Sequence, residues 1–121
     1  METTLQERKV LSLEEIARLL GAVMFCGRDL SYKVSEVAAA DMMSDVLALS
    51  KPGMLLLTGL VSPQVIRTAV VADLSGVVFV RGKKPGSEIL DLAKEAGIPV
   101  LGTSMTMFQA AGVLYVAFSG R

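Results

Sequence analysis

Met54-Leu-Leu-Leu-Thr58-Gly59 is the first of three apolar stretches in this chain that each end in a polar tip. The other two are Val77-Val-Phe-Val80-Arg81-Gly82-Lys83 and Ile98-Pro-Val-Leu101-Gly102-Thr103-Ser104. Short, nearly unbroken apolar runs of this kind are typical of strands that are buried on both faces of a parallel sheet. A segment with helical spacing follows each tip. The sequence therefore predicts an α/β fold with a mostly parallel central sheet.

Local signals mark where the surrounding helices begin and end. Ser12-Leu-Glu-Glu15 has the spacing of a capping box, in which the serine hydroxyl and the glutamate carboxylate each accept a backbone amide. Ser62-Pro63 supplies an N-cap and a first helical residue, and Gly21 and Gly97 are stop signals. Ser44 is a candidate cap of the second helix. The predicted helices cover 13–20, 41–50, a segment that starts after Ser62, 87–96 and 103–111.

Three further segments have weaker patterns. Ala22 to Cys26 is a short apolar run that indicates a strand, and Val34 to Ala38 indicates another. The tail from Val113 to Phe118 fits either an edge strand or a docking segment. At 121 residues the chain is expected to form a single domain over residues 1–121.

The balance of charge and aromatic content argues against two classes of partner. Twelve Lys and Arg residues face twelve Asp and Glu residues, and aromatic residues make up only 5% of the chain. A nucleic-acid binder would show a basic excess and aromatic stacking residues. No apolar run is long enough to span a bilayer, and the first residues lack the features of a signal peptide. The sequence thus predicts a cytoplasmic protein that binds neither nucleic acid nor membrane.

The apolar content is high for a small chain, at 52% of the residues. Part of that apolar surface is expected to be shared with a partner, and self-association is the simplest way to cover it. The sequence therefore predicts a homodimer. Methionines near the predicted helix starts either fill the core or contribute to a partner surface; they are Met42, Met43, Met105 and Met107.

The chain has one cysteine, Cys26, and no histidine. This composition excludes an internal disulfide, a Cys–His nucleophile and the ordinary zinc sites, and Cys26 itself is expected to be a small buried hydrophobe. Asp29, Asp41 and Asp45 are candidate metal carboxylates, but acidic residues near a helix start explain them equally well. No cofactor fingerprint or nucleophile–base pair can be assembled. We therefore predict a protein without a metal, a cofactor or catalytic residues.

The strand tips together suggest an anion site. Hydroxyls and cations would meet at one edge of a parallel sheet, where helix N-termini also attract negative charge. A phosphate or carboxylate is bound by such a set, although polar loops at strand ends also occur without a ligand. Gly82-Lys83 lacks the spacing of a phosphate-binding P-loop. The candidate ligand-binding residues are Thr58, Gly59, Ser62, Arg67, Arg81, Gly82, Lys83, Thr103 and Ser104, with Lys84 and Thr106 beside them.

Four segments resemble the DRTGG domain family, over roughly Leu13 to Ala111. They are Ala40-Asp41-Met-Met-Ser44-Asp45, Leu55-Leu-Leu-Thr58-Gly59, Val80-Arg-Gly-Lys-Lys-Pro85 and Glu95-Ala-Gly-Ile-Pro-Val-Leu101. Members occur as the N-terminal domain of HPr kinase/phosphorylase, in some phosphotransacetylases, beside CBS domains and as small free-standing proteins. The resemblance implies a Rossmann-like α/β/α fold of three layers, frequent dimerisation, and an accessory or regulatory role.

The chain departs from the residues that give the family its name. Leu60-Val61 stands where the family has Asp-Arg, and Arg81-Gly82-Lys83 stands where it has Thr-Gly-Gly. Two functional hypotheses follow. The first is a non-catalytic regulatory module that senses a small phosphorylated ligand or nucleotide at the strand tips. The second is a homodimeric interaction module that docks on a partner enzyme or signalling protein.

Overall fold

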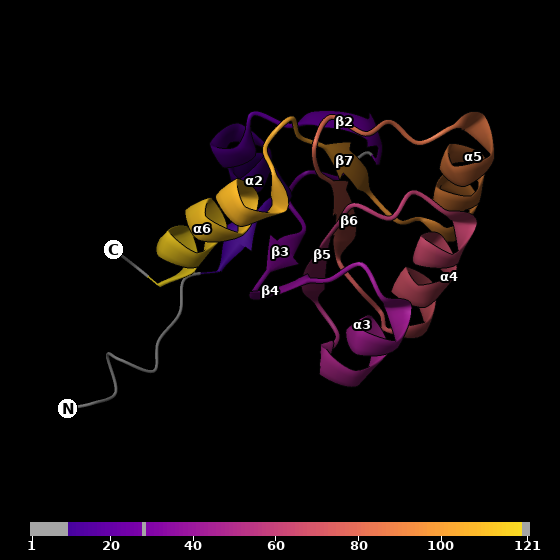
Figure 1. Ribbon diagram of the computed structural model, residues 1–121, viewed down its shortest axis with the longest axis horizontal. Coiled ribbons are helices and arrows are strands. Elements are labelled where there is room, and N and C mark those ends of the chain that lie inside the picture. Colours follow the sequence, from indigo (N-terminus) through magenta and orange to yellow (C-terminus); the bar gives the residue numbers. More distant parts are fainter. Residues whose placement is uncertain (1–9, 28, 120–121) are drawn as a thin grey trace.

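A five-stranded sheet forms the centre of the molecule. The computed structural model describes residues 10–27 and 29–119. The strand order is β2-β7-β6-β5-β4, in which β4, β5, β6 and β7 run parallel and β2 runs antiparallel to β7. The predicted parallel α/β sheet is therefore confirmed (Figure 1). The strands are β2 (Val23–Cys26), β4 (Glu36–Ala39), β5 (Met54–Thr58), β6 (Gly76–Phe79) and β7 (Val100–Gly102).

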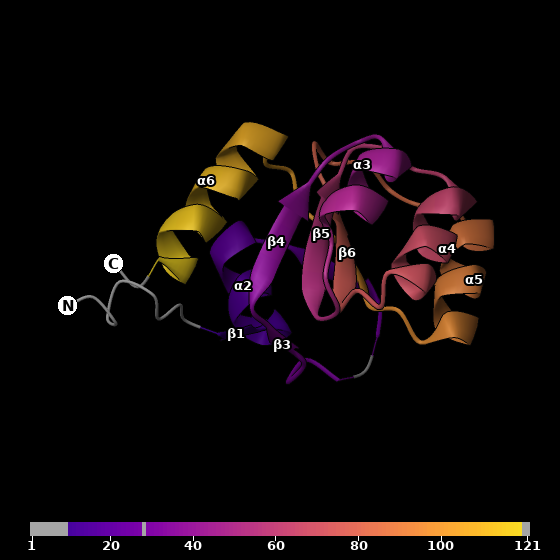
Figure 2. The ribbon, with the colours of Figure 1, turned by 90° about the horizontal axis from the view of Figure 1, so that it is seen from below.

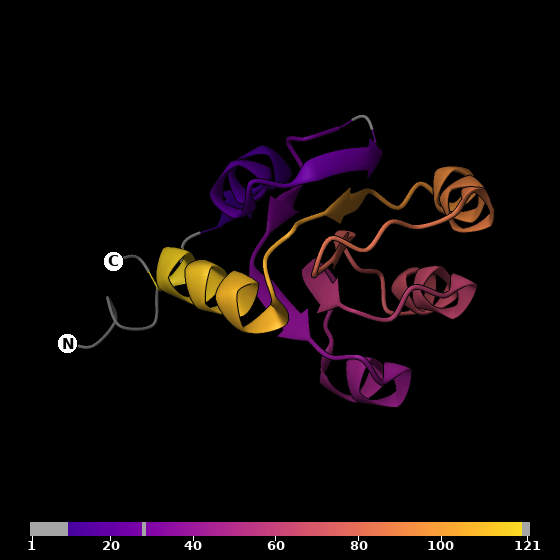
Figure 3. The ribbon, with the colours of Figure 1, turned by 45° about the horizontal axis from the view of Figure 1, so that its top comes forward.

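Helices cover both faces of this sheet, which confirms the three-layer α/β/α arrangement. Figures 2 and 3 show α2 and α6 on one side of the strands and α3, α4 and α5 on the other. The helices are α2 (Leu13–Leu20), α3 (Met43–Leu49), α4 (Pro63–Val71), α5 (Ser87–Ala96) and α6 (Met107–Phe118).

The central strands are apolar throughout because each face of the sheet has its own core. On β5, Leu56 packs with residues of α4 and α5, whereas Leu55 and Leu57 pack with residues of α2 and α6. All five residues of β5 are buried. The alternation of side chains along a strand thus divides one apolar run between two separate cores.

The predicted capping signals are present in the structure. Ser12 Oγ accepts a hydrogen bond from the Glu15 amide at 3.1 Å, and Glu15 Oε1 accepts one from the Ser12 amide at 2.9 Å. Ser62 Oγ accepts one from the Gln64 amide at 3.2 Å. Gly21 and Gly97 end α2 and α5 with left-handed backbone conformations. These local signals could therefore be read from sequence alone.

One of the predicted strands has a different arrangement from the one expected. The segment Val34 to Ala38 is divided between β3 (Lys33–Val34), which pairs with β1 (Leu11–Ser12) in a separate antiparallel sheet, and β4. The apolar run that ends at Cys26 forms β2 as predicted. Because β2 is antiparallel to β7, its carboxyl end lies at the edge opposite the polar tips.

The helix predicted over 41–50 is shorter in the structure. Its N-cap is Met42 rather than Ser44, and Asp41 precedes the helix. The candidate metal carboxylates Asp41 and Asp45 therefore do not share a helix face.

The C-terminal segment differs most from the prediction. The helix expected over 103–111 begins at Met107, and it continues to Phe118 through the tail, for which the sequence left an edge strand and a docking segment open. Thr106 and Gln109 form a capping box at its start. The edge-strand alternative for 113–118 is excluded by this helix, whose period is hard to see in the sequence because its residues are nearly all apolar or small. None of the helices in the described part of the chain is long and apolar enough to cross a membrane.

Candidate functional site

At the carboxyl edge of the sheet, hydrogen bonds join the loops that follow β4, β5 and β6. Asp41 Oδ1, after β4, accepts the Gly59 amide at 2.7 Å and the Thr58 hydroxyl at 3.2 Å. Lys83 Nζ, after β6, donates to the Gly59 carbonyl oxygen at 2.6 Å. Gly59 is therefore held from both neighbouring loops, one through an anion and the other through a cation. Parallel strands bring these three loops to one edge, as the sequence predicted.

The loop after β6 turns through two residues with left-handed backbone conformations. Arg81 has φ 61° and Gly82 has φ 70°. Such a conformation is uncommon for arginine and costs about 1 kcal/mol or more. It is fixed by backbone hydrogen bonds from the Arg81 amide to the Met105 carbonyl oxygen (2.8 Å) and from the Gly82 amide to the Thr103 carbonyl oxygen (2.9 Å). The loop after β7 thus imposes the turn that carries Arg81.

Opposite charges converge on Gly59. A β-carbon added there would lie 3.3 Å from Arg81 Nη2 and 3.5 Å from Asp41 Oδ1. Lys83 reaches the carbonyl of the same residue. A side chain at position 59 would press on the end of the flexible Arg81 side chain, which would have to shift by a few tenths of an ångström, so glycine leaves the most room for this approach.

The remaining candidate ligand-binding residues do not all lie in the cluster at Gly59. Thr103 is buried, and its hydroxyl donates to the Leu20 carbonyl oxygen at 2.7 Å, so it joins the loop to α2. Ser104 is exposed at the end of β7, Ser62 caps α4, and Arg67 is exposed one turn further along α4. The structure therefore brings Thr58, Gly59, Arg81 and Lys83 together, and it directs the Thr103 hydroxyl away from them.

Several polar groups of this edge are already used within the chain. The Leu60 amide donates to Thr58 Oγ1 at 3.1 Å, and the Arg81 and Gly82 amides donate to the loop after β7. A ligand at this edge would therefore be met mainly by side chains, above all the exposed Arg81. In the sequence, Asp41 was a candidate metal ligand or an acidic residue near a helix start, and its role in holding Gly59 had no signal in the sequence.

The candidate metal carboxylates serve other purposes or lie apart. Asp29 Oδ1 accepts the amide (2.9 Å) and the hydroxyl (2.5 Å) of Ser31, which lowers the pKa of the Asp29 carboxyl group. Asp41 holds Gly59, as described above. Within residues 10–27 and 29–119, no group of three or more Asp, Glu or Cys side chains is placed to hold a metal ion.

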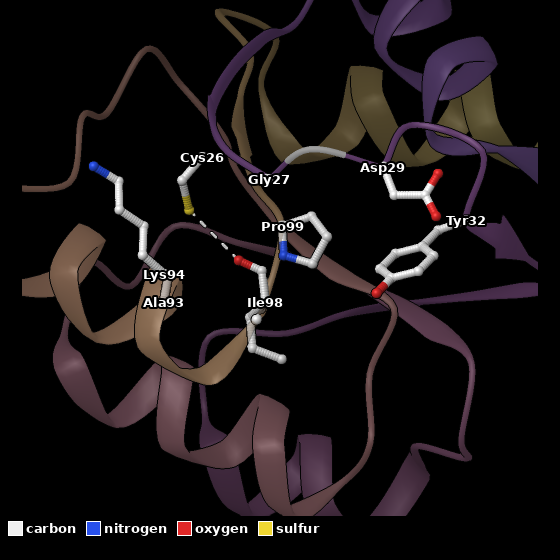
Figure 4. Close-up of a pocket in the computed structure, with 9 residues that line it drawn as sticks. Cys26, Gly27, Asp29, Tyr32, Ala93, Lys94, Ile98 and Pro99 are labelled. Carbon is white, nitrogen blue, oxygen red and sulfur yellow. Dashed lines mark hydrogen bonds between the residues drawn. The ribbon is translucent and has the colours of Figure 1, made fainter.

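A cavity of about 550 Å³ lies at the opposite, amino edge of the sheet, between the end of β2 and the end of α5 (Figure 4). Figure 4 shows Lys94 on one side of it and Asp29 and Tyr32 on the other. Cys26 Sγ lies 3.5 Å from the Ile98 carbonyl oxygen, and burial raises the pKa of the Cys26 thiol. No pattern in the sequence indicates this cavity, because it depends on the antiparallel placement of β2.

Comparison with known families identifies the chain. The model of the DRTGG domain matches residues 15–116. The chain belongs to the DRTGG domain family. The resemblance stated from the sequence is therefore confirmed. No curated protein matches the chain significantly.

A solved structure with a similar fold is the CBS and DRTGG domains of the regulatory region of Clostridium perfringens pyrophosphatase, complexed with the activator diadenosine tetraphosphate. It matches 89% of this chain with a TM-score of 0.72 and 22% sequence identity. The chain spans 46% of that structure's length. The similarity confirms the α/β/α fold, and in that neighbour the DRTGG domain is part of a regulatory region.

Proposed function

We propose that this DRTGG protein is a non-catalytic regulatory module that senses a small phosphorylated ligand or nucleotide at the carboxyl edge of its sheet. The observation that carries the proposal is the convergence of Arg81 and Lys83 on the loop at Gly59. A guanidinium and an ammonium group that approach one point form the usual protein environment of a phosphate. Ser62 and Ser104 supply hydroxyls at the same edge.

The backbone of Arg81 supports a role beyond packing. Strained residues cluster at ligand sites, where surrounding contacts maintain a conformation that the residue alone disfavours. Arg81 is exposed and has a positive φ, and its turn is held by two hydrogen bonds to the neighbouring loop. The direction in which the Arg81 side chain leaves the backbone is thus set before a ligand arrives.

The nucleotide activator of the Clostridium neighbour supports the class of ligand. That region contains CBS domains as well as a DRTGG domain, and this chain corresponds to about half of it. A cytoplasmic location, expected from the sequence, fits a sensor of metabolites. We therefore propose regulation, and not catalysis, as the role of this chain.

Thermal unfolding of the purified protein against a panel of nucleotides and phosphorylated metabolites tests the proposal. A ligand at one hundred times its Kd adds about 2.7 kcal/mol to the free energy of unfolding, which raises Tm by several degrees in a domain of this size. Arg81→Ala and Lys83→Ala should each weaken binding about 10- to 100-fold, since each removes a charge-assisted hydrogen bond worth about 1.5–3 kcal/mol.

Lys94→Ala is the matched control, because Lys94 is an exposed cation beside the cavity at the opposite edge. It should leave the affinity unchanged. A ligand whose binding is lost in Lys94→Ala and kept in Arg81→Ala would instead occupy the amino-edge cavity, and the proposed placement would be wrong. A panel that produces no shift at all would remove the support for sensing.

The second candidate is an interaction module that acts on a partner enzyme or signalling protein. Exposed apolar side chains favour it, since Leu49 and Val71 are 65% and 76% exposed on the side of the sheet opposite α6. In that case the panel gives no shift, and substitutions at the carboxyl edge leave the activity of the partner unchanged.

A further inference from the structure

Asp41 places a negative charge inside the site that is proposed for a phosphate. A β-carbon added at Gly59 would lie 3.3 Å from Arg81 Nη2, 3.5 Å from Asp41 Oδ1 and 3.7 Å from Asp41 Oδ2. The guanidinium group and both carboxylate oxygens therefore surround the same position in front of Gly59. A phosphate that binds Arg81 there also meets the charge of Asp41, and like charges at this distance repel each other.

The structural role of Asp41 does not require its charge. One oxygen atom, Oδ1, accepts both the Gly59 amide at 2.7 Å and the Thr58 hydroxyl at 3.2 Å. The carbonyl oxygen of an asparagine can accept the same two hydrogen bonds. The second oxygen, Oδ2, has no hydrogen-bond partner in the part of the chain that the structure describes, and Asp41 is exposed. One carboxylate oxygen is therefore available to a ligand.

Arg81 and Asp41 do not neutralise each other directly. Within residues 10–27 and 29–119, the two side chains form no ion pair within 4.0 Å, although both lie close to Gly59. A space therefore separates them, and Gly59 leaves it open because it has no side chain. Lys83 Nζ is bound to the Gly59 carbonyl oxygen at 2.6 Å. The space thus has an exposed cation on one side and an exposed anion on the other.

We propose that the ligand of this edge is the Mg²⁺ complex of a compound with two or more adjacent phosphate groups, in which Asp41 binds the metal ion and Arg81 the phosphate oxygens. Mg²⁺ is usually held by one or two carboxylates together with phosphates of the substrate and waters. One carboxylate therefore suffices, and no cluster of three is needed. Adjacent phosphates are required because the ion bridges oxygens of neighbouring phosphate groups. The inference rests on the proposed function and names the class of its ligand.

The charges and dimensions of the site fit such a complex. Mg²⁺–oxygen bonds of about 2.0–2.1 Å and a charge-assisted N–H···O bond of about 2.8 Å let a carboxylate–metal–phosphate–guanidinium chain span about 4–7 Å, depending on its angles. The metal ion also turns the repulsion between Asp41 and the phosphates into an attraction. Lys84, exposed beside the same loop, can meet the remaining negative charge. A bare phosphate monoester gains nothing from Asp41.

The metal dependence of binding tests this inference. The probes are AMP, ADP, ATP and inorganic pyrophosphate, together with any compound that raises Tm in the panel of nucleotides and phosphorylated metabolites. Each is titrated calorimetrically in excess MgCl₂ and in EDTA. A ligand with adjacent phosphates should bind at least about 10-fold more tightly with Mg²⁺, whereas AMP should show no such gain. Equal affinity in Mg²⁺ and in EDTA overturns the inference, as does binding of monophosphates alone.

Asp41→Asn separates metal binding from the structural role. The variant keeps an oxygen for the Gly59 amide and loses the charge, so the ratio of the affinities in Mg²⁺ and EDTA should fall below about 2-fold. Asp45→Asn is the matched control, because it removes a nearby exposed carboxylate from α3, and it should keep the full metal dependence. If both variants lose the dependence, or if neither does, Asp41 does not hold the metal ion.

Failure of this inference and failure of the proposed function give different results. If Arg81→Ala leaves the affinity unchanged, or if no probe binds in either buffer, the proposed function fails and the inference fails with it. If binding depends on Arg81 but not on Mg²⁺, the inference alone fails.

Paramagnetic Mn²⁺ locates the ion in the wild-type protein, so this measurement does not depend on the folding of a variant. With a probe bound, Mn²⁺ in place of Mg²⁺ should broaden the amide NMR signals of Asp41 and Gly59. The signal of Gly97 should stay sharp, because Gly97 ends α5 at the opposite edge of the sheet. Broadening at Gly97 and not at Gly59, or at neither residue, overturns the inference.

Discussion

The carboxyl edge of the sheet and the outer face of α6 differ in what their side chains already contact. At the carboxyl edge, Asp41, Thr58 and Lys83 all bind Gly59 or its neighbours within the chain. On α6, Phe108 and Tyr115 project into solvent with more than three quarters of their surface exposed. The first region is polar and internally connected, and the second is apolar and uncovered.

This difference shows that polar residues at a strand tip are weak evidence for a ligand until their partners are known. Several of the candidate groups at the edge, Lys83 among them, already hold the loops together, so the exposed Arg81 carries most of the case for a ligand. The exposed apolar face of α6 is stronger evidence for a partner, since no contact within the described part of the chain accounts for its apolar side chains. The two surfaces therefore predict different binding partners and can be tested separately.

Removal of Asp41 should give the largest change in stability. Asp41→Ala leaves the buried Gly59 amide without its acceptor, which costs about 1–3 kcal/mol. Urea unfolding measures the loss. Asp91→Ala, which removes an exposed carboxylate from α5, should change stability by less than about 0.5 kcal/mol. If the two variants behaved alike, the edge would not be the connected network described here.

Substitution of Gly112 should have a smaller effect of opposite sign. Gly112→Ala improves helix propensity and should stabilise the protein by about 0.5–1 kcal/mol, because a β-carbon at this position meets no atom within 4 Å. Urea denaturation measures the gain. Gly97→Ala should destabilise, since Gly97 has φ 75°.

The smallest expected change in stability concerns the Cys26 thiol, which lines the cavity at the amino edge of the sheet. Burial raises the pKa of Cys26 in the folded protein. Above the unfolded pKa of about 8.5, the unfolded chain releases a proton that the folded protein retains, so stability falls as pH rises from there towards the folded pKa. Cys26→Ala should remove this dependence between pH 7 and 10.

Alkylation of Cys26 adds a ligand test. Iodoacetamide should react slowly with the native protein at neutral pH, because the thiolate is the reactive form. A ligand at the carboxyl edge should leave that slow rate unchanged. A ligand that lowers the rate of Cys26 alkylation further would lie in the cavity beside Cys26. The ligand site would then be at the amino edge of the sheet and not at the carboxyl edge.

The parts of the fold that the sequence predicted are those governed by local rules. The apolar run at Leu55–Leu57, the capping box at Ser12 and the N-cap at Ser62 each depend on residues that are close in the chain. The tail was missed because α6 has no polar stripe to reveal its period. The capping box of Thr106 and Gln109 was the available signal, and it would have predicted the start of this helix.

The sequence predicted which residues lie at the candidate site, but not which groups their side chains contact. Parallel strands guarantee that the tips at Thr58 and Arg81 share one edge, and this followed from the sequence. The partner of each side chain did not follow, since hydrogen bonds such as Asp41 to Gly59 and Thr103 to Leu20 join residues that are distant in the chain.

The sequence by itself determined the parallel α/β class of fold and the set of charges at the strand tips, because apolar runs and caps are short-range properties. The three layers were implied by the resemblance to the DRTGG family. Only the tertiary structure decided that β2 is antiparallel, that Arg81 takes a left-handed conformation and that the apolar surface of α6 faces outward. Each of these depends on which distant segments pack together, and packing is a property of the whole chain.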